Sequence, residues 1–91
     1  MAIEVRVPAM LRSVTGGQRV VYGEGGTVGA LFENLEREYP GLRGQLFENG
    51  QPRRFVNIYV NDEDIRYLDK LDTSLHDGDV VSILPAVAGG A

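Results

Sequence analysis

Cysteine is absent from this sequence, and so are the side-chain chemistries that depend on it. None of the 91 residues is a cysteine, which excludes a disulfide framework, a thiolate metal site and a thiol nucleophile. The start of the chain lacks the basic and apolar regions of a signal peptide, and no apolar run approaches the roughly 18–20 residues that span a bilayer. We therefore expect a soluble, cytoplasmic protein whose chemistry uses no side-chain thiol.

Positive charge and histidine are also scarce. Nine basic residues against 13 acidic ones give a formal net charge of −4, which repels phosphate backbones and anionic lipid, so neither nucleic acid nor a membrane is expected as a partner. His76 is the single histidine, and without a cysteine it cannot build a metal site or a catalytic triad. No side-chain constellation remains that could turn over a substrate. The sequence predicts a protein that is not an enzyme and binds no metal or cofactor of its own.

Two kinds of local motif resemble ligand sites but fail on spacing. The glycine-rich residues 23–29 precede an expected helix, yet they lack the G-x-G-x-x-G frame of dinucleotide sites and the Lys-Ser/Thr of a P-loop. The acidic residues at 62–64 and 77–79 do not follow the alternating spacing of calcium loops. Turns and a helix start explain these segments better. Arg53-Arg54 could pair with an acidic partner surface, although so short a charge run is usually just solvated.

Hydrophobic periodicity divides the chain into strands and one long helix. Alternating and β-branched runs predict strands over residues 3–7, 19–22, 55–60 and 80–84. An apolar stripe from Val28 to Tyr39 has helical spacing, follows Thr27, which is a capping residue type, and stops at Pro40-Gly41.

The remaining segments are shorter. Residues 42–52 are expected to be irregular, with a short helical turn pinned to the core by Leu42, Leu46 and Phe47. A turn at residues 61–64 should lead into a short edge segment at residues 65–68. The order of elements predicts an α+β protein with the β-grasp, or ubiquitin-like, fold: a mixed sheet of four to five strands crossed by one main helix.

The last residues show no sign of regular structure. We assign residues 1–85 to the ubiquitin-like domain and residues 86–91, which end in Gly-Gly-Ala, to a flexible tail. Five extended residues reach about 17 Å at roughly 3.3–3.6 Å each, which is far enough to enter another protein's active site. Gly89 and Gly90 carry no Cβ, so we expect them, with Val87 and Ala88, to thread a narrow channel.

Three stretches of the chain resemble one protein family. They are Leu11-Arg12 with residues 15–18, then residues 54–64, and finally residues 77–90. They are similar to the ubiquitin-like sulfur carriers of the ThiS/MoaD family, and within it to the carriers of actinobacterial cysteine biosynthesis. The resemblance implies that an activating enzyme uses ATP and Mg to adenylate the Gly90 carboxylate, which is then converted to a thiocarboxylate. It further implies two partners: a pyridoxal-phosphate cysteine synthase, or another sulfur-accepting enzyme, and a zinc metalloprotease.

Ala91 departs from the family's pattern, in which the second glycine carries the reactive carboxylate. Because adenylation needs a free carboxylate, we interpret the chain as a precursor that is processed between Gly90 and Ala91. Two alternatives stay open at this point: Ala91 blocks the carrier deliberately, or it is not native to the chain.

Other interpretations keep the fold and change the use of the tail. The chain could be the small subunit of molybdopterin synthase, a ubiquitin-like modifier attached to lysines, or a sulfur donor in thiamine or secondary-metabolite biosynthesis. It could also be an interaction domain with an inert tail. Detection of a carboxyl-terminal thiocarboxylate would distinguish a carrier from a domain with an inert tail. Detection of isopeptide-linked conjugates would identify a modifier.

Strand alternation also predicts a docking surface. Residues 56, 58, 60, 81 and 83 should face the core. The outward set is then Phe55, Tyr59, Val80 and Leu84, which is more apolar than solvent requires and suits a partner interface.

Overall fold

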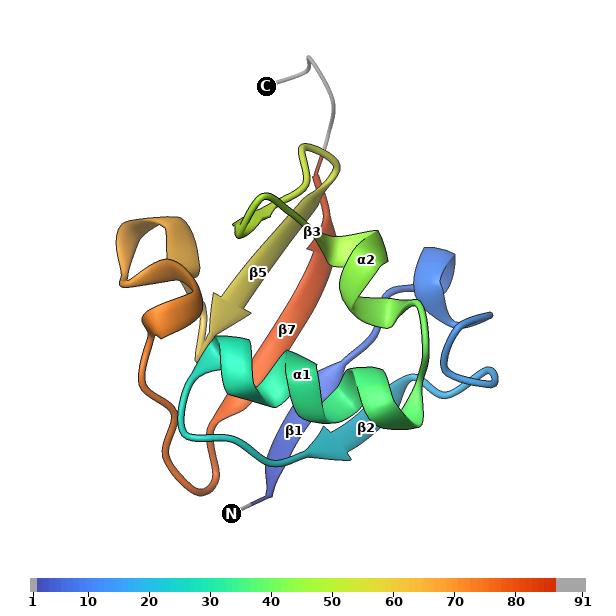
Figure 1. Ribbon diagram of the computed structural model, residues 1–91, viewed down its shortest axis with the longest axis horizontal. Helices are drawn as coiled ribbons and strands as arrows, with labels where there is room; N and C mark the ends of the chain where they lie inside the picture. Colours follow the sequence, from blue (N-terminus) through green and yellow to red (C-terminus); the bar gives the residue numbers. More distant parts are fainter. Residues whose placement is uncertain (1, 87–91) are drawn as a thin grey trace.

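A five-stranded mixed sheet, crossed on one face by a long helix, forms the body of the chain (Figure 1). This computed structural model describes residues 2–86. The strands follow the spatial order β2-β1-β7-β5-β6. Their bounds are β1 Ile3–Arg6, β2 Val20–Gly23, β5 Val56–Val60, β6 Glu63–Asp64 and β7 Val80–Pro85. The predicted β-grasp fold is thereby confirmed.

Strand β7 is central because it pairs on both of its edges. Its neighbour β1 is parallel, with Val5 opposite Val81, and its neighbour β5 is antiparallel, with Ile58 opposite Ile83. The hairpin of β1 and β2 encloses a long loop that contains the 3₁₀ helix η1 (Ala9–Leu11). A parallel pair needs a long crossover, and the whole middle of the chain supplies it.

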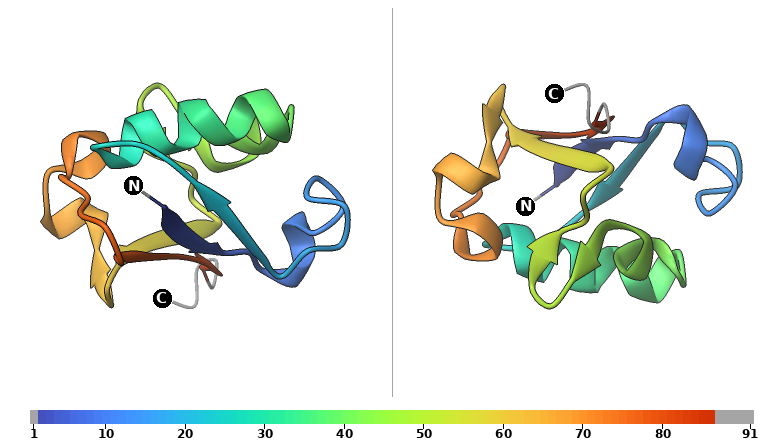
Figure 2. Two further views of the ribbon diagram at one scale, coloured as in Figure 1. Left: turned by 90° about the horizontal axis from the view of Figure 1, so that it is seen from below. Right: turned by 90° about the horizontal axis from the view of Figure 1, so that it is seen from above.

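The main helix, α1 (Val28–Glu38), forms as its sequence predicts. The Thr27 hydroxyl oxygen accepts the Ala30 N–H at 3.1 Å and so caps the first turn. Val28, Leu31, Phe32 and Leu35 of the helix are fully buried. In both views of Figure 2, α1 lies over one face of the sheet, and no helix of residues 2–86 covers the opposite face.

The core lies between α1 and the sheet and is closed at one end by a second, short helix. This helix, α2 (Leu42–Leu46), buries Leu42 and Leu46 completely, as predicted. Phe47 follows it and packs edge-to-face on Phe32, with ring centroids 5.2 Å apart. The predicted inward residues of β5 and β7 are all buried: Val56, Ile58, Val60, Val81 and Ile83.

The segment that follows α2 is more regular than predicted. It forms a small hairpin of β3 (Phe47–Glu48) and β4 (Gln51–Pro52), separate from the main sheet. Its two turn residues, Asn49 and Gly50, both have positive φ, at 54° and 77°. Asparagine and glycine tolerate this conformation best, which accounts for the tight turn.

The predicted edge segment at residues 65–68 is wrong. The edge strand is β6, at Glu63–Asp64, and the next residues form the 3₁₀ helix η2 (Ile65–Tyr67). Asn61 and Asp62 have φ of 48° and 73°, so the chain reverses within two residues and pairs with β5 earlier than expected. The Asp64 carboxylate then accepts the Arg66 N–H at 2.8 Å and starts the 3₁₀ turn. A third short helix, η3 (Lys70–Asp72), follows and packs against α1.

Two glycines before α1 allow the chain to pass close to the helix. A Cβ on Gly23 would lie 2.9 Å from side-chain carbons of Leu31 and Leu35. A Cβ on Gly25 would lie 2.5 Å from the backbone nitrogen of Leu31. Because backbone atoms cannot move aside as a flexible side chain can, Gly25 is required for this crossing. Close packing against α1 thus explains Gly23 and Gly25 of the glycine-rich run.

Gly25→Ala should therefore destabilise the fold, whereas Gly26→Ala should not. A Cβ on Gly26 meets no atom within 4 Å, and its φ is not positive. We expect Gly25→Ala to lower the free energy of unfolding by about 1–3 kcal/mol through overpacking and Gly26→Ala to change it by less than about 0.5 kcal/mol. Urea denaturation followed by circular dichroism measures both. Equal stabilities of the two variants would contradict the close approach at Gly25.

Candidate functional site

The site predicted from the sequence begins where the described chain ends. Val87, Ala88, Gly89, Gly90 and Ala91 lie outside the described residues. The structure defines the base from which they continue, residues 84–86, which we call the tail root. Figure 1 shows that β7 reaches this root at the end of the sheet opposite to the start of β1.

Backbone pairing fixes the tail root to the sheet. Pro85 lies opposite Val56 in the register of β7 and β5. One residue further on, the Ala86 N–H donates a hydrogen bond to the Phe55 carbonyl oxygen at 2.8 Å. The ladder therefore continues through Ala86, four residues before Gly90.

The strand beside the tail root is braced by Arg66. One guanidinium nitrogen of Arg66, Nη1, donates to the Asn57 side-chain oxygen at 2.7 Å, and the other, Nη2, donates to the Val56 carbonyl at 3.0 Å. Asn57 lies opposite Leu84 in β7. The arginine fork thus ties η2 to β5 next to the root, a role that the sequence alone did not indicate.

The open face of the sheet carries the predicted docking residues. Phe55 and Leu84 are 42% and 48% exposed, and Tyr59 and Val80 are half-buried. Tyr59, Val80 and Leu84 alternate with the buried residues of β5 and β7, and Phe55 is exposed just before β5; that these four residues form a docking surface stays a prediction. A hollow of about 480 Å³ is lined by two of these residues, Tyr59 and Leu84, together with Arg6, Asp62 and Ser82. An apolar surface with a polar border therefore adjoins the tail root.

Two charged groups on this face, Arg6 and Glu4, form an ion pair. The Arg6 Nε donates to the Glu4 carboxylate at 2.8 Å. This hydrogen bond, followed by the charge of Glu4, raises the pKa of Arg6 above its already high ordinary value. Arg6 is therefore permanently cationic at the border of the hollow.

The turn that leads into β7 is held by Asn61 and Asp79. The Asn61 amide nitrogen donates to the Asp79 carboxylate at 2.9 Å, and its oxygen accepts the Val80 N–H at 3.0 Å. The second carboxylate oxygen of Asp79 accepts the His76 N–H at 2.8 Å. The Asn61 bond, followed by the His76 N–H, lowers the pKa of Asp79. The acidic residues 77–79 therefore include a structural carboxylate, and His76 is exposed beside it.

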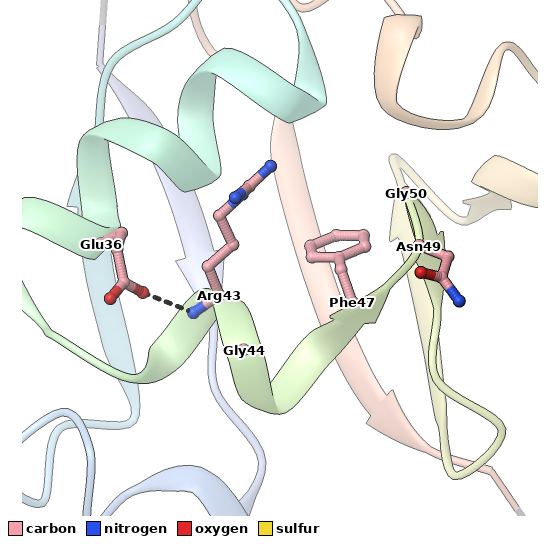
Figure 3. A pocket seen from close by; sticks show the side chains of 6 residues that line it. All are labelled: Glu36, Arg43, Gly44, Phe47, Asn49 and Gly50. Atoms are coloured by element: carbon pink, nitrogen blue, oxygen red, sulfur yellow. Dashed lines mark hydrogen bonds between the residues drawn. The ribbon is translucent and has the colours of Figure 1, made fainter.

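A second hollow, of about 290 Å³, lies on the other side of the molecule between α1, α2 and the β3-β4 hairpin (Figure 3). The Glu36 carboxylate at its rim accepts the N–H groups of Gly41 and Arg43, each at 2.8 Å. These two bonds, Gly41 first, lower the pKa of Glu36. Because Glu36 joins α1 to the start of α2, the hollow is explained by the packing of these helices.

Two negative findings concern residues 2–86. No group of three or more His, Asp or Glu side chains in this range could hold a metal ion. No helix in the same range has the length and apolar content that a bilayer crossing requires.

Comparison with known proteins finds small sulfur carriers. The sequence model of the ThiS family matches residues 5–90. The chain is 50% identical to the sulfur carrier protein CysO of Mycobacterium tuberculosis, over 99% of this chain and 100% of that protein. It is 40% identical to small archaeal modifier protein 3 of Haloferax volcanii, over 99% and 100% of the two chains. A chain of the solved Amycolatopsis orientalis BexX/CysO complex superimposes with a TM-score of 0.89 and 41% identity, covering 97% of this chain and 99% of that one.

Proposed function

We propose, from the premise that this chain belongs to the ThiS family of sulfur carrier proteins, that Gly90 is the residue that carries the sulfur. The observation that carries this proposal is the attachment of the tail. The last strand is anchored at the centre of the sheet as far as Ala86, and the glycine pair follows within four residues. At most about 14 Å of extended chain then separates Gly90 from the body, which suits delivery into a partner's active site.

The chemistry proceeds at the carboxyl group of Gly90. A terminal carboxylate, with a pKa of about 3.3–3.7, is ionised at neutral pH and resists nucleophiles. The activating enzyme joins the carboxylate to the α-phosphate of Mg-ATP, and pyrophosphate leaves. A hydrosulfide donor then attacks the acyl carbon, the bond to AMP breaks, and a thiocarboxylate remains. The sulfur is held on an acyl group, which supports a carrier role for a chain that contains no cysteine.

Ala91 must leave before this chemistry can begin. While Ala91 is attached, the Gly90 carbonyl is an amide, and the main-chain carboxylate belongs to Ala91, one residue further along. We propose that a zinc metalloprotease cleaves the bond between Gly90 and Ala91. Both residues are thus the processing site.

The open face of the sheet is the proposed contact for the activating enzyme. Phe55, Tyr59, Val80 and Leu84 present apolar surface on the side that α1 leaves uncovered. The same face adjoins the tail root, so an enzyme bound there would also meet the tail. The Amycolatopsis orientalis CysO forms a complex with BexX, which supports a protein partner for this chain as well.

Cysteine biosynthesis is the proposed destination of the sulfur. Identity of 50% over the full chain to a CysO supports this choice over molybdopterin, thiamine or secondary-metabolite synthesis. A pyridoxal-phosphate cysteine synthase would hold an aminoacrylate, and the thiocarboxylate sulfur would attack it. The chain acts as the protein co-substrate of these enzymes in the cytoplasm.

A second candidate function is protein modification. It is favoured by 40% identity to a small archaeal modifier protein, and it would use the same activated Gly90 to acylate lysines. Isopeptide-linked conjugates in a lysate of the source cells would support it, and a thiocarboxylate without conjugates would favour the carrier.

A chain that ends at Gly90 should accept sulfur, and the chain that ends at Ala91 should not. Both are incubated with the activating enzyme, Mg-ATP and sulfide, and their intact masses are read. The shortened chain should gain the mass of sulfur in place of oxygen, because only it offers the Gly90 carboxylate. Thiocarboxylate formed on Ala91 at the same rate would contradict the precursor interpretation. No thiocarboxylate on either chain would contradict the carrier chemistry itself.

Leu84→Asp should weaken binding of the activating enzyme without unfolding the protein. A charge at a 48%-exposed apolar position removes buried contact area and adds a carboxylate that must be desolvated. Met10→Asp is the matched control, because Met10 is 45% exposed but lies on η1. In calorimetric titrations we expect about a 10-fold or larger loss of affinity for Leu84→Asp and none for Met10→Asp. Equal affinities of the two variants would contradict the proposal that the activating enzyme binds the open face of the sheet.

A further inference from the structure

Strand β2 forms one edge of the sheet and, among residues 2–86, pairs only with β1 (Figure 1). The alternation of an antiparallel ladder decides which of its backbone groups are used. The Val7 N–H donates to the Arg19 carbonyl oxygen at 2.8 Å, so Val21, two residues further along, also exchanges hydrogen bonds with β1. The N–H and C=O groups of Val20 and Tyr22 therefore point away from β1, toward the open edge.

The open edge is short because the chain uses the neighbouring backbone groups itself. The Gln18 N–H donates to the Thr15 carbonyl oxygen at 3.3 Å, and the Glu24 N–H donates to the Asn34 side-chain oxygen at 2.9 Å. Two donors and two acceptors remain between these points, and no hydrogen bond within residues 2–86 engages them. Free edge groups are a template for pairing with another strand, and here they fit a partner strand that is equally short.

The side chains of β2 leave this edge unprotected. Natural edge strands are usually blunted by a charge, a proline or a bulge, and Val20–Gly23 contains none of these. Tyr22 is 61% exposed, and Val20 is half-buried. If two β2 strands pair antiparallel, Val20 of one copy lies opposite Tyr22 of the other. An aromatic side chain opposite a β-branched one is a favourable cross-strand pair.

A hollow of about 220 Å³ lies beside the end of β2 and is acidic. Its lining includes Gly23 and Glu24, together with Asn34 and Glu38 of α1. Glu38 is exposed, and its carboxylate has no hydrogen bond or ion pair with residues 2–86. This end of the edge therefore offers an unpaired carboxylate on the side of the sheet that α1 covers.

Arg19 supplies the complementary charge at the other end of the same strand. It is exposed, and its guanidinium has no partner in the described part of the chain. Alternation places Arg19 on the α1 side of the sheet, with Val21 and Gly23. A two-fold axis through Val21 sets Arg19 of one copy opposite Gly23 of the other, beside the hollow that Glu38 lines.

We infer that β2 is a self-association edge: two copies pair their β2 strands antiparallel, and Arg19 of each copy binds Glu38 of the other. Val20 faces Tyr22 twice in this ladder, and each facing pair exchanges two hydrogen bonds. Residues of equal parity stay on one face, so the two-fold axis is perpendicular to the sheet and both open faces point the same way. Strand β1 separates this edge from β7 and the tail root, so the contact is independent of the proposed function.

A second copy fits this edge better than an unrelated extended segment does. Each copy brings a strand of matching length and both members of the ion pair. The charges also fix the direction, because a parallel arrangement would place Arg19 beside Arg19 and leave Glu38 without a cation. Electrostatic complementarity of this kind sets register and orientation more than it sets affinity.

The test measures the mass of the full-length chain by sedimentation equilibrium at low salt. The contact is small, so we expect association between about 10 µM and 1 mM. The variants are Arg19→Glu, Glu38→Arg and the double variant that carries both changes. Arg54→Glu is the matched control, because Arg54 is exposed and precedes β5, which β1 and β7 separate from β2. It changes the net charge as Arg19→Glu does.

Each single variant should weaken dimerisation by about 10-fold or more, because two attractions become two repulsions. The double variant should restore the affinity to within about 3-fold, since it reverses both charges of each pair. Arg54→Glu should change the affinity by less than about 3-fold. Circular dichroism checks the fold of every variant, and recovery in the double variant separates a lost contact from misfolding.

Amide hydrogen exchange tests the ladder itself. As the concentration rises, the Val20 and Tyr22 amides should become protected in proportion to the dimerised fraction, whereas Val21, already bonded to β1, should change little. A chain that stays monomeric up to about 1 mM would overturn the inference. So would a dimer whose affinity Arg19→Glu leaves unchanged, a double variant that does not recover, or unchanged exchange at Val20 and Tyr22.

Discussion

The parallel pairing of β1 with β7 is the constraint on which the rest of the structure depends. Because β7 takes hydrogen bonds from β1 on one edge and β5 on the other, the last element of the chain is held in the middle of the sheet. The tail root therefore leaves the body from its most firmly paired strand. The bond between Ala86 and Phe55 extends this order to within four residues of Gly90. The sheet thus fixes the point from which the remaining residues continue.

The two faces of the sheet differ in what covers them. One face is buried under α1 and α2, whose apolar residues supply the stabilising contacts of a chain this small. The other face has no helix above it in residues 2–86 and keeps Phe55 and Leu84 partly exposed. The buried core and the proposed partner contact thus lie on opposite faces of the sheet, so we expect a substitution on the open face to change binding without loosening the core.

Much of this arrangement could be predicted from the sequence, since periodicity encodes burial. Alternation predicted β5 and β7, and Thr27 with Pro40-Gly41 predicted the bounds of α1. The sequence did not predict the position of β6. Asn61 and Asp62 adopt positive φ, and residues of these types occur in turns with either sign of φ, so their presence does not fix where the chain reverses. Nor could the sequence predict the bond between Asn61 and Asp79, which joins residues 18 apart in the chain. The assignment of Gly90 rests on family resemblance and chemistry, because the tail lies outside the described residues.

The state of Gly90 in the living cell tests the central claim most directly. The protein is isolated from its source organism without added thiols or amines, and the mass of its intact carboxyl-terminal peptide is measured. The account predicts a peptide that ends at Gly90, with a fraction in which sulfur replaces one carboxyl oxygen and which reacts with a thiol-specific alkylating agent. A population that ends beyond Gly90 throughout, with no sulfur-bearing fraction even when cysteine is withheld from the medium, would contradict it.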